Sequence, residues 1–94
     1  MLHTVYCSID LHFPVCQSLK EKRMILKGLK ERIRSRYNVA LAEEDYSELW
    51  QRTRLACVSV AHEKQALVTL IDGILRSLEE NRSIQVLESS TEYF

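Results

Sequence analysis

The sequence has few residues that break secondary structure. Its 94 residues include two glycines and one proline, and 46% are hydrophobic. This composition excludes a disordered or low-complexity chain. No repeat or Gly/Ser-rich linker interrupts it. We therefore predict a single domain over residues 1–94 with one modest core.

The cysteines lack the spacing of a cross-link or a metal site. Cys7, Cys16 and Cys57 are odd in number and far apart, with no Cys-x-x-Cys pair. The histidines have no ligand spacing either. This pattern predicts reduced, buried thiols and neither a metal nor another cofactor.

Long apolar segments and catalytic motifs are also absent. No apolar run approaches the roughly 18 residues of a membrane helix, and no charged-then-apolar leader stands at the start. We expect a cytoplasmic protein without a membrane partner. A Gly-rich phosphate loop and a nucleophile–base arrangement are missing, so we expect no enzymatic activity.

Alternating polarity predicts a half-buried first strand over residues 4–12, which Pro14 stops. One face takes Val5, Cys7, Ile9 and Leu11, and the other takes Thr4, Tyr6, Ser8, Asp10 and His12.

A helix is predicted over residues 18–36. Ser18 and Glu21 have the spacing of a capping box, in which each side chain bonds a backbone N–H at the helix start. Its apolar face is expected to contain Leu19, Leu26, Leu29, Ile33 and Tyr37.

The remaining elements follow in the order strand, strand, helix, strand. Residues 38–43 and 53–61 are expected to be strands joined by a polar hairpin connection, and 83–90 (SIQVLESS) a final strand. A second helix starts at residue 62 or 63, with Leu67, Leu70, Ile71, Ile74 and Leu78 inside. The order predicts a ferredoxin-like βαββαβ sandwich of the α+β class. Two helices cover one face of a four-stranded antiparallel sheet, with the first and third strands central.

Several segments in this order resemble a known family. SLKEKR, LKGLKERIRSRYNVALAE and ELWQR, together with Asp10-Leu11-His12-Phe13-Pro14, are similar to the bacterial YlxP-like family of small uncharacterised domains. The resemblance covers nearly the whole chain and implies a ferredoxin-like fold. Genes of that family commonly lie beside translation-initiation and ribosome-maturation genes, which implies a link to RNA or the ribosome.

Positive charge is concentrated on the first predicted helix. Residues 18–36 hold eight of the thirteen Lys and Arg residues, although the formal net charge is zero. Lys20, Arg23, Lys27, Lys30 and Arg34 form a stripe along one flank, which Lys22 or Arg36 would assist. Such a stripe can follow nucleic-acid phosphates. The alternative is a solvated helix flank.

Two further groups of residues near the predicted hairpin are candidate binding residues. Trp50 and Arg52 are candidates for stacking on a base, and the alternative for Trp50 is a place in the core or a lid. Glu43, Glu44, Asp45 and Glu48 suggest a cation site, but they lack the EF-hand pattern, which favours a solvated hairpin tip.

Two functions remain open at this point. The first is an RNA- or ribosome-associated binding protein that uses the basic stripe. The second is a self-associating structural or regulatory module without a nucleic-acid partner. It would form a homodimer through the open sheet face at Tyr6 or through the edge run SIQVL.

Overall fold

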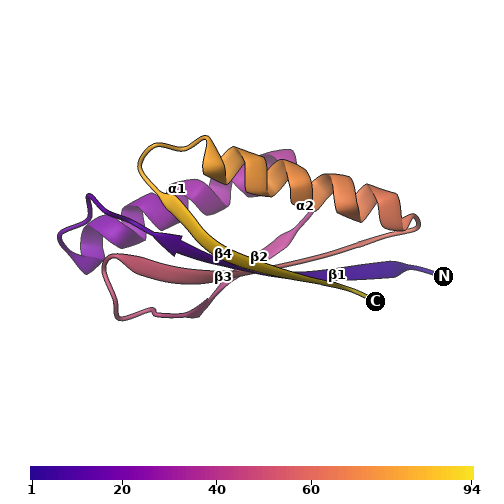
Figure 1. The fold of residues 1–94 in the computed structure, drawn as a ribbon, viewed down its shortest axis with the longest axis horizontal. Coiled ribbons are helices and arrows are strands. Elements are labelled where there is room, and N and C mark those ends of the chain that lie inside the picture. The colour runs from indigo at the N-terminus through magenta and orange to yellow at the C-terminus, as the bar shows by residue number, and fades with distance from the viewer.

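The computed structural model describes all 94 residues and has the predicted ferredoxin-like architecture (Figure 1). The elements are β1 (His3–His12), α1 (Leu19–Arg36), β2 (Ala40–Asp45), β3 (Arg52–Ala61), α2 (Lys64–Glu79) and β4 (Gln85–Tyr93). The antiparallel sheet has the order β2-β3-β1-β4, and both helices lie on one of its faces. The central positions of β1 and β3 are confirmed.

Strand β1 is the centre of the sheet. It pairs with β3 from His3 opposite Ala61 to His12 opposite Arg52, and with β4 on its other side. A bulge interrupts the β4 pairing between Asp10 and Leu11. The predicted core face of β1 is completely buried, which leaves the alternate side chains on the face that no helix covers.

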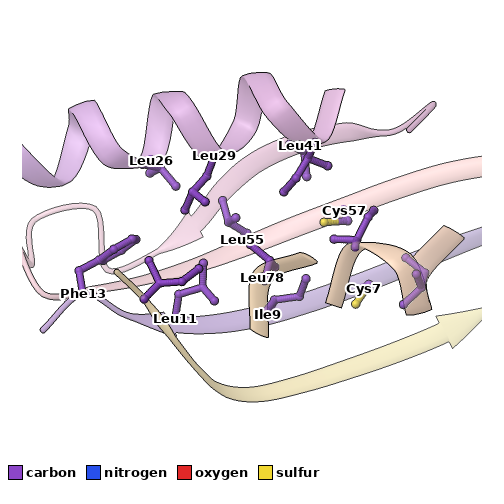
Figure 2. Packing of buried hydrophobic residues seen from close by; sticks show 14 of the residues in the cluster. Cys7, Ile9, Leu11, Phe13, Leu26, Leu29, Leu41, Leu55, Cys57 and Leu78 are labelled. Atoms are coloured by element: carbon purple, nitrogen blue, oxygen red, sulfur yellow. The ribbon is translucent and has the colours of Figure 1, made fainter. Parts of the chain in front are cut away.

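The core lies between the sheet and the helices (Figure 2). Leu26 and Leu29 of α1 and Leu78 of α2 pack on residues such as Ile9 and Leu55 of the central strands. All three cysteines are free and buried. Burial raises the pKa of the Cys16 thiol and that of Cys57, the latter to about 12. The cysteines thus act as small apolar core residues.

Helix α1 begins at the predicted cap. The Ser18 hydroxyl accepts a hydrogen bond from the Glu21 backbone N–H at 3.1 Å. The return bond differs from the prediction, because the Glu21 carboxylate accepts from the N–H of Gln17 at 2.9 Å and not from that of Ser18. The box therefore extends one residue further back along the chain.

Gly73 of helix α2 lies where Tyr37, the residue after α1, packs against that helix. A Cβ on Gly73 would lie 2.7 Å from the hydroxyl oxygen of Tyr37, which follows α1 directly. That contact is shorter than van der Waals packing allows, so the missing side chain makes room for the tyrosine. Neither helix combines the length and apolar composition that a membrane crossing requires.

The predicted bounds of β2 (38–43) and β4 (83–90) were wrong at both ends, since the strands run from Ala40 to Asp45 and from Gln85 to Tyr93. Strand β2 starts at Ala40 and not at 38, where the Asn38 carbonyl instead accepts from the Ser59 hydroxyl. Strand β4 starts at Gln85 and not at 83. The Asn81 side chain holds the Ser83 N–H in a turn at 2.9 Å, and Ile84 is in the core. The run SIQVL therefore supplies only its last three residues to the edge strand.

Candidate functional site

A shallow groove of about 390 Å³ lies between α1 and the edge strand β2. Its lining contains four of the five basic residues of the predicted stripe, one apolar residue and two acids: Arg23, Lys27, Lys30, Arg34, Leu26, Glu31 and Glu43. The fifth, Lys20, is exposed on the same flank one turn earlier and does not line the groove.

The periodicity of α1 explains why these cations gather. Residues three and four positions apart share a helix face, and the buried residues Leu26, Leu29 and Ile33 turn the neighbouring flank toward β2. From Arg23 to Arg34 the four positions span about 16 Å at 1.5 Å per residue. The cationic stripe is thus one continuous wall of the groove.

None of the four groove cations is matched to a carboxylate. The ion pairs within 4.0 Å involve only Lys22, Arg52 and Arg54 as cations. Arg34 donates one bond, to the Leu41 carbonyl of β2 at 3.1 Å. Arg23, Lys27 and Lys30 make no side-chain hydrogen bond to the protein. Their charges are available to a ligand.

The structure corrects the expectation for Lys22. Its side chain is 1% exposed, and its ammonium lies 2.9 Å from Glu43 and donates to the Tyr46 carbonyl at 2.6 Å. Lys22 belongs to the buried face of α1 together with Leu26 and Leu29. A buried ammonium requires such partners, so Lys22 joins α1 to β2 and does not reach a phosphate.

Glu43 forms part of the groove floor. Strand alternation puts it on the same face as the buried Leu41, so its side chain points toward α1. Its Oε2 accepts from Lys22 and from the Thr53 hydroxyl. Burial alone would raise the pKa of Glu43, but these bonds outweigh it and hold the pKa below its ordinary value. Glu43 is therefore an ionised carboxylate fixed among cations.

A second charged cluster lies on the open face of the sheet. Asp10 of β1 is 5% exposed and accepts from two arginines of β3. Arg54 Nε lies 2.6 Å from one carboxylate oxygen, and Arg52 Nη2 lies 3.0 Å from the other. The Arg54 bonds, aided by Arg52, outweigh desolvation and hold the pKa of Asp10 below its ordinary value.

Tyr46 completes this cluster from the loop after β2. Its ring lies 4.7 Å from the Arg52 guanidinium and 5.1 Å from that of Arg54, and its hydroxyl accepts from Arg54 at 3.1 Å. Its backbone is left-handed, with φ of 63°, which is unfavourable for a bulky residue. These contacts, with the bond from Lys22, hold that conformation in place.

Trp50 is not a core residue. It is 47% exposed and lines a shallow pocket of about 360 Å³ with His12, Leu49, Gln51 and Arg52. Its loop is tied to the β1–α1 loop, because the Phe13 N–H donates to the Gln51 carbonyl at 2.9 Å. Both loops lie at the end of the molecule opposite the chain termini (Figure 1). Trp50 is accessible to a base, whereas Arg52 is already engaged by Asp10 and Tyr46.

The acidic residues of the hairpin point to separate partners. Glu43 bonds Lys22, Glu44 accepts from Ser8 at 2.8 Å, and Asp45 lies 3.6 Å from Arg54. No three His, Cys, Asp or Glu side chains converge as metal ligands would. Glu43 thus belongs to the groove, Asp45 lies beside the arginines of the open face, Glu44 bonds only Ser8, and Glu48 is exposed.

Sequence reasoning did not identify the role of Glu43. It was grouped with the solvated hairpin tip, although the alternation of β2 puts it beside Leu41 on the inner face. The predicted strand over residues 38–43 already included Glu43, and its alternation with Leu41 was enough to indicate a carboxylate facing the helix.

The fold defines the molecule as a small ferredoxin-like α+β protein with one covered and one open sheet face. A family model described as "Protein of unknown function (DUF503)" matches residues 4–91. The chain is also 30% identical over 77 residues to the uncharacterized protein YlxP of Bacillus subtilis (strain 168), covering 82% of this chain and 84% of that protein. The chain belongs to this YlxP-like family, as the resemblance predicted.

Proposed function

We propose that the protein binds RNA, free or within a ribosomal particle, through the groove between α1 and β2. The observation that carries the proposal is the set of four unpaired cations along one wall of that groove. Unpaired cations in a row are suited to successive phosphates, since each contact releases counterions from the nucleic acid. Trp50 is a candidate stacking contact at the loop end, as aromatic rings stack on unpaired bases.

Electrostatics within the fold support this use of the groove. Lys22, Arg52 and Arg54 each have a carboxylate partner within 4.0 Å. The groove cations have none, and they repel one another in the free protein. A polyanion in the groove would relieve that repulsion.

The test is a double charge reversal, Lys27→Glu with Lys30→Glu. We expect RNA affinity at low salt to fall about 100-fold or more, because two attractive contacts become repulsive. Because Lys30 is half-buried and lies near Glu43, thermal unfolding of the variant is recorded, and the affinities are compared per folded molecule. For the unmodified protein on single-stranded RNA, four phosphate contacts predict a log–log salt slope of about −3.

The matched control is Arg32→Glu with Arg36→Glu. Both arginines are exposed on α1 outside the groove, so the net charge changes equally while the groove stays intact. We expect this variant to keep most of the RNA affinity. Equal losses of RNA affinity in both variants would show that binding depends on the overall charge of the protein and not on the groove. RNA binding that survives charge reversal at Lys27 and Lys30 would exclude the groove as the binding site.

Self-association is the second candidate, and one observation favours it. Val58 and Val60 of β3 are 36% and 49% exposed and lie opposite Tyr6 and Thr4 on the open face. The test is light scattering at low and high salt, which measures the oligomeric state under the conditions of the RNA titrations. A dimer that is insensitive to salt and retains no RNA would favour the interaction module over RNA binding.

A further inference from the structure

The position of Glu43 within the groove restricts the kind of ligand group that can bind beside it. β2 runs back along α1, since Arg34 contacts Leu41 and the buried Lys22 contacts Tyr46. Glu43 lies between Leu41 and Tyr46 in the chain, and it therefore faces the middle of the cationic wall. Lys30 is close enough to lower the pKa of Glu43.

One oxygen of this carboxylate has no protein partner. Oε2 takes the bonds from Lys22 and Thr53, whereas no protein donor contacts Oε1, and the side chain is 21% exposed. A carboxylate accepts hydrogen bonds and donates none. A ligand group that contacts Oε1 is therefore favourable when it is a hydrogen-bond donor, whereas a phosphate placed there would meet a like charge.

The sugar–phosphate backbone of RNA offers one hydrogen-bond donor per nucleotide, the ribose 2′-hydroxyl. The DNA backbone offers none, because it lacks that hydroxyl. We propose that Glu43 accepts a hydrogen bond from a ribose 2′-hydroxyl, while the cations on either side contact the flanking phosphates. The groove then selects RNA over DNA. This inference rests on the proposed RNA binding and adds a specificity-determining residue to it.

The first test leaves the protein unchanged and alters the ligand. Three labelled oligonucleotides of equal length are titrated by fluorescence anisotropy: oligouridine, its 2′-deoxy counterpart and its 2′-O-methyl counterpart. All three oligomers carry uracil, whose only base donor, N3–H, is the same in each, so a difference in affinity between them reports on the sugar. We expect RNA to bind about ten-fold tighter than both others, in line with a hydrogen bond to a charged acceptor.

The 2′-O-methyl oligomer separates donor recognition from recognition of sugar shape. It retains a ribose-type sugar but cannot donate a hydrogen bond. Binding as weak as that of the deoxy oligomer supports the proposal. Binding as tight as that of RNA overturns it, and so does equal binding of all three.

The second test replaces the acceptor. In Glu43→Gln, Lys22 and Thr53 would hold the amide oxygen, and the amide nitrogen, a donor, would face the groove. We expect the preference for RNA over the other two oligomers to fall to about two-fold or less. A preference that survives this substitution excludes Glu43. Because Lys22 loses a charged partner, thermal unfolding of this variant is recorded, and the wild-type oligonucleotide series decides the proposal if the variant fails to fold.

The matched control is Glu31→Gln, at the other acid of the groove. Glu31 is exposed and forms no ion pair, so its removal should strengthen binding of all three oligomers alike and leave their ratio unchanged. The outcomes also distinguish the two proposals. Salt-dependent binding without a preference for one sugar would contradict only the proposed role of Glu43. Absence of binding to all three oligomers would contradict both the proposed RNA binding and this inference.

Discussion

The two charged regions of the molecule use the same residue types in opposite ways. On the open face, Arg52 and Arg54 converge on the nearly buried Asp10 and stack on Tyr46. In the groove, four cations of α1 lie in a row, and none has a carboxylate within 4.0 Å. In the first region each arginine has a carboxylate within 4.0 Å, and Asp45 at 3.6 Å from Arg54 balances the second positive charge, whereas no such partner exists in the second region.

This difference distinguishes structural charge from charge available to a ligand. A matched cluster at low exposure contributes to stability, and removing one member leaves the others unsatisfied. An unmatched row contributes little to stability and retains its electrostatic field toward solvent. Lys22 illustrates the boundary, since it lies on the same helix as the groove cations but belongs to the matched class.

The largest expected effect breaks the matched region. Asp10→Ala removes the carboxylate that Arg52 and Arg54 share. Arg54 keeps the Tyr46 hydroxyl and Asp45, and both arginines reach solvent, so we expect a loss of about 2 kcal/mol in the free energy of unfolding. Urea denaturation measures it. RNA affinity per folded molecule should not change. The comparison is Glu31→Ala, an exposed and unpaired acid, for which we expect less than about 0.5 kcal/mol. Equal effects of the two substitutions would contradict the distinction.

The next prediction uses acid to weaken the same region. Hydrogen bonds from Arg54 and Arg52 hold the pKa of Asp10 below its ordinary value of 3.8. The stabilisation is therefore fully present above about pH 4 and is lost as the pH falls through the lowered pKa. The thermal unfolding midpoint of the wild type should fall as the pH is lowered, and the midpoint of Asp10→Ala should fall by less. Parallel declines in both proteins would show that Asp10 is not involved.

The smallest effect compares one conservative exchange in each region. Arg54→Lys loses the two-nitrogen contact with Asp10 and the stacking on Tyr46, so we expect a loss of stability smaller than that of Asp10→Ala. Lys27→Arg keeps a cation where only charge is required, so stability and RNA affinity should remain near those of the wild type. Calorimetry and anisotropy measure the two quantities. A large loss of RNA affinity in Lys27→Arg would show that the groove requires a specific side-chain geometry and not only a positive charge at this position.

Much of the fold follows from local patterns in the sequence. Alternation in residues 4–12 and helical periodicity in 18–36 depend on neighbouring residues only, and both elements lie where they were expected. The same periodicity contained information that we did not use. On a wheel of about 100° per residue, Lys22 falls between Leu29 and Ile33, so its burial could have been predicted.

The matched cluster could not have been predicted in this way. Asp10 and Arg54 are 44 residues apart in sequence and meet only through the register of β1 against β3. A shift of one residue in that register would place them on opposite faces. The exposure of Trp50 likewise depends on how two loops are tied together, which no local pattern describes.

The close approach of Tyr37 to Gly73 has a consequence for how a ligand would enter the groove. Tyr37 fastens one end of α1 to α2, and Lys22 fastens the other end to the loop after β2. A helix anchored at both ends to different elements does not swing away from its neighbour, so the spacing between α1 and β2 is set before any encounter. In the proposed complex, conformational adjustment would fall on the flexible RNA, and the entropic cost of ordering would be that of the RNA.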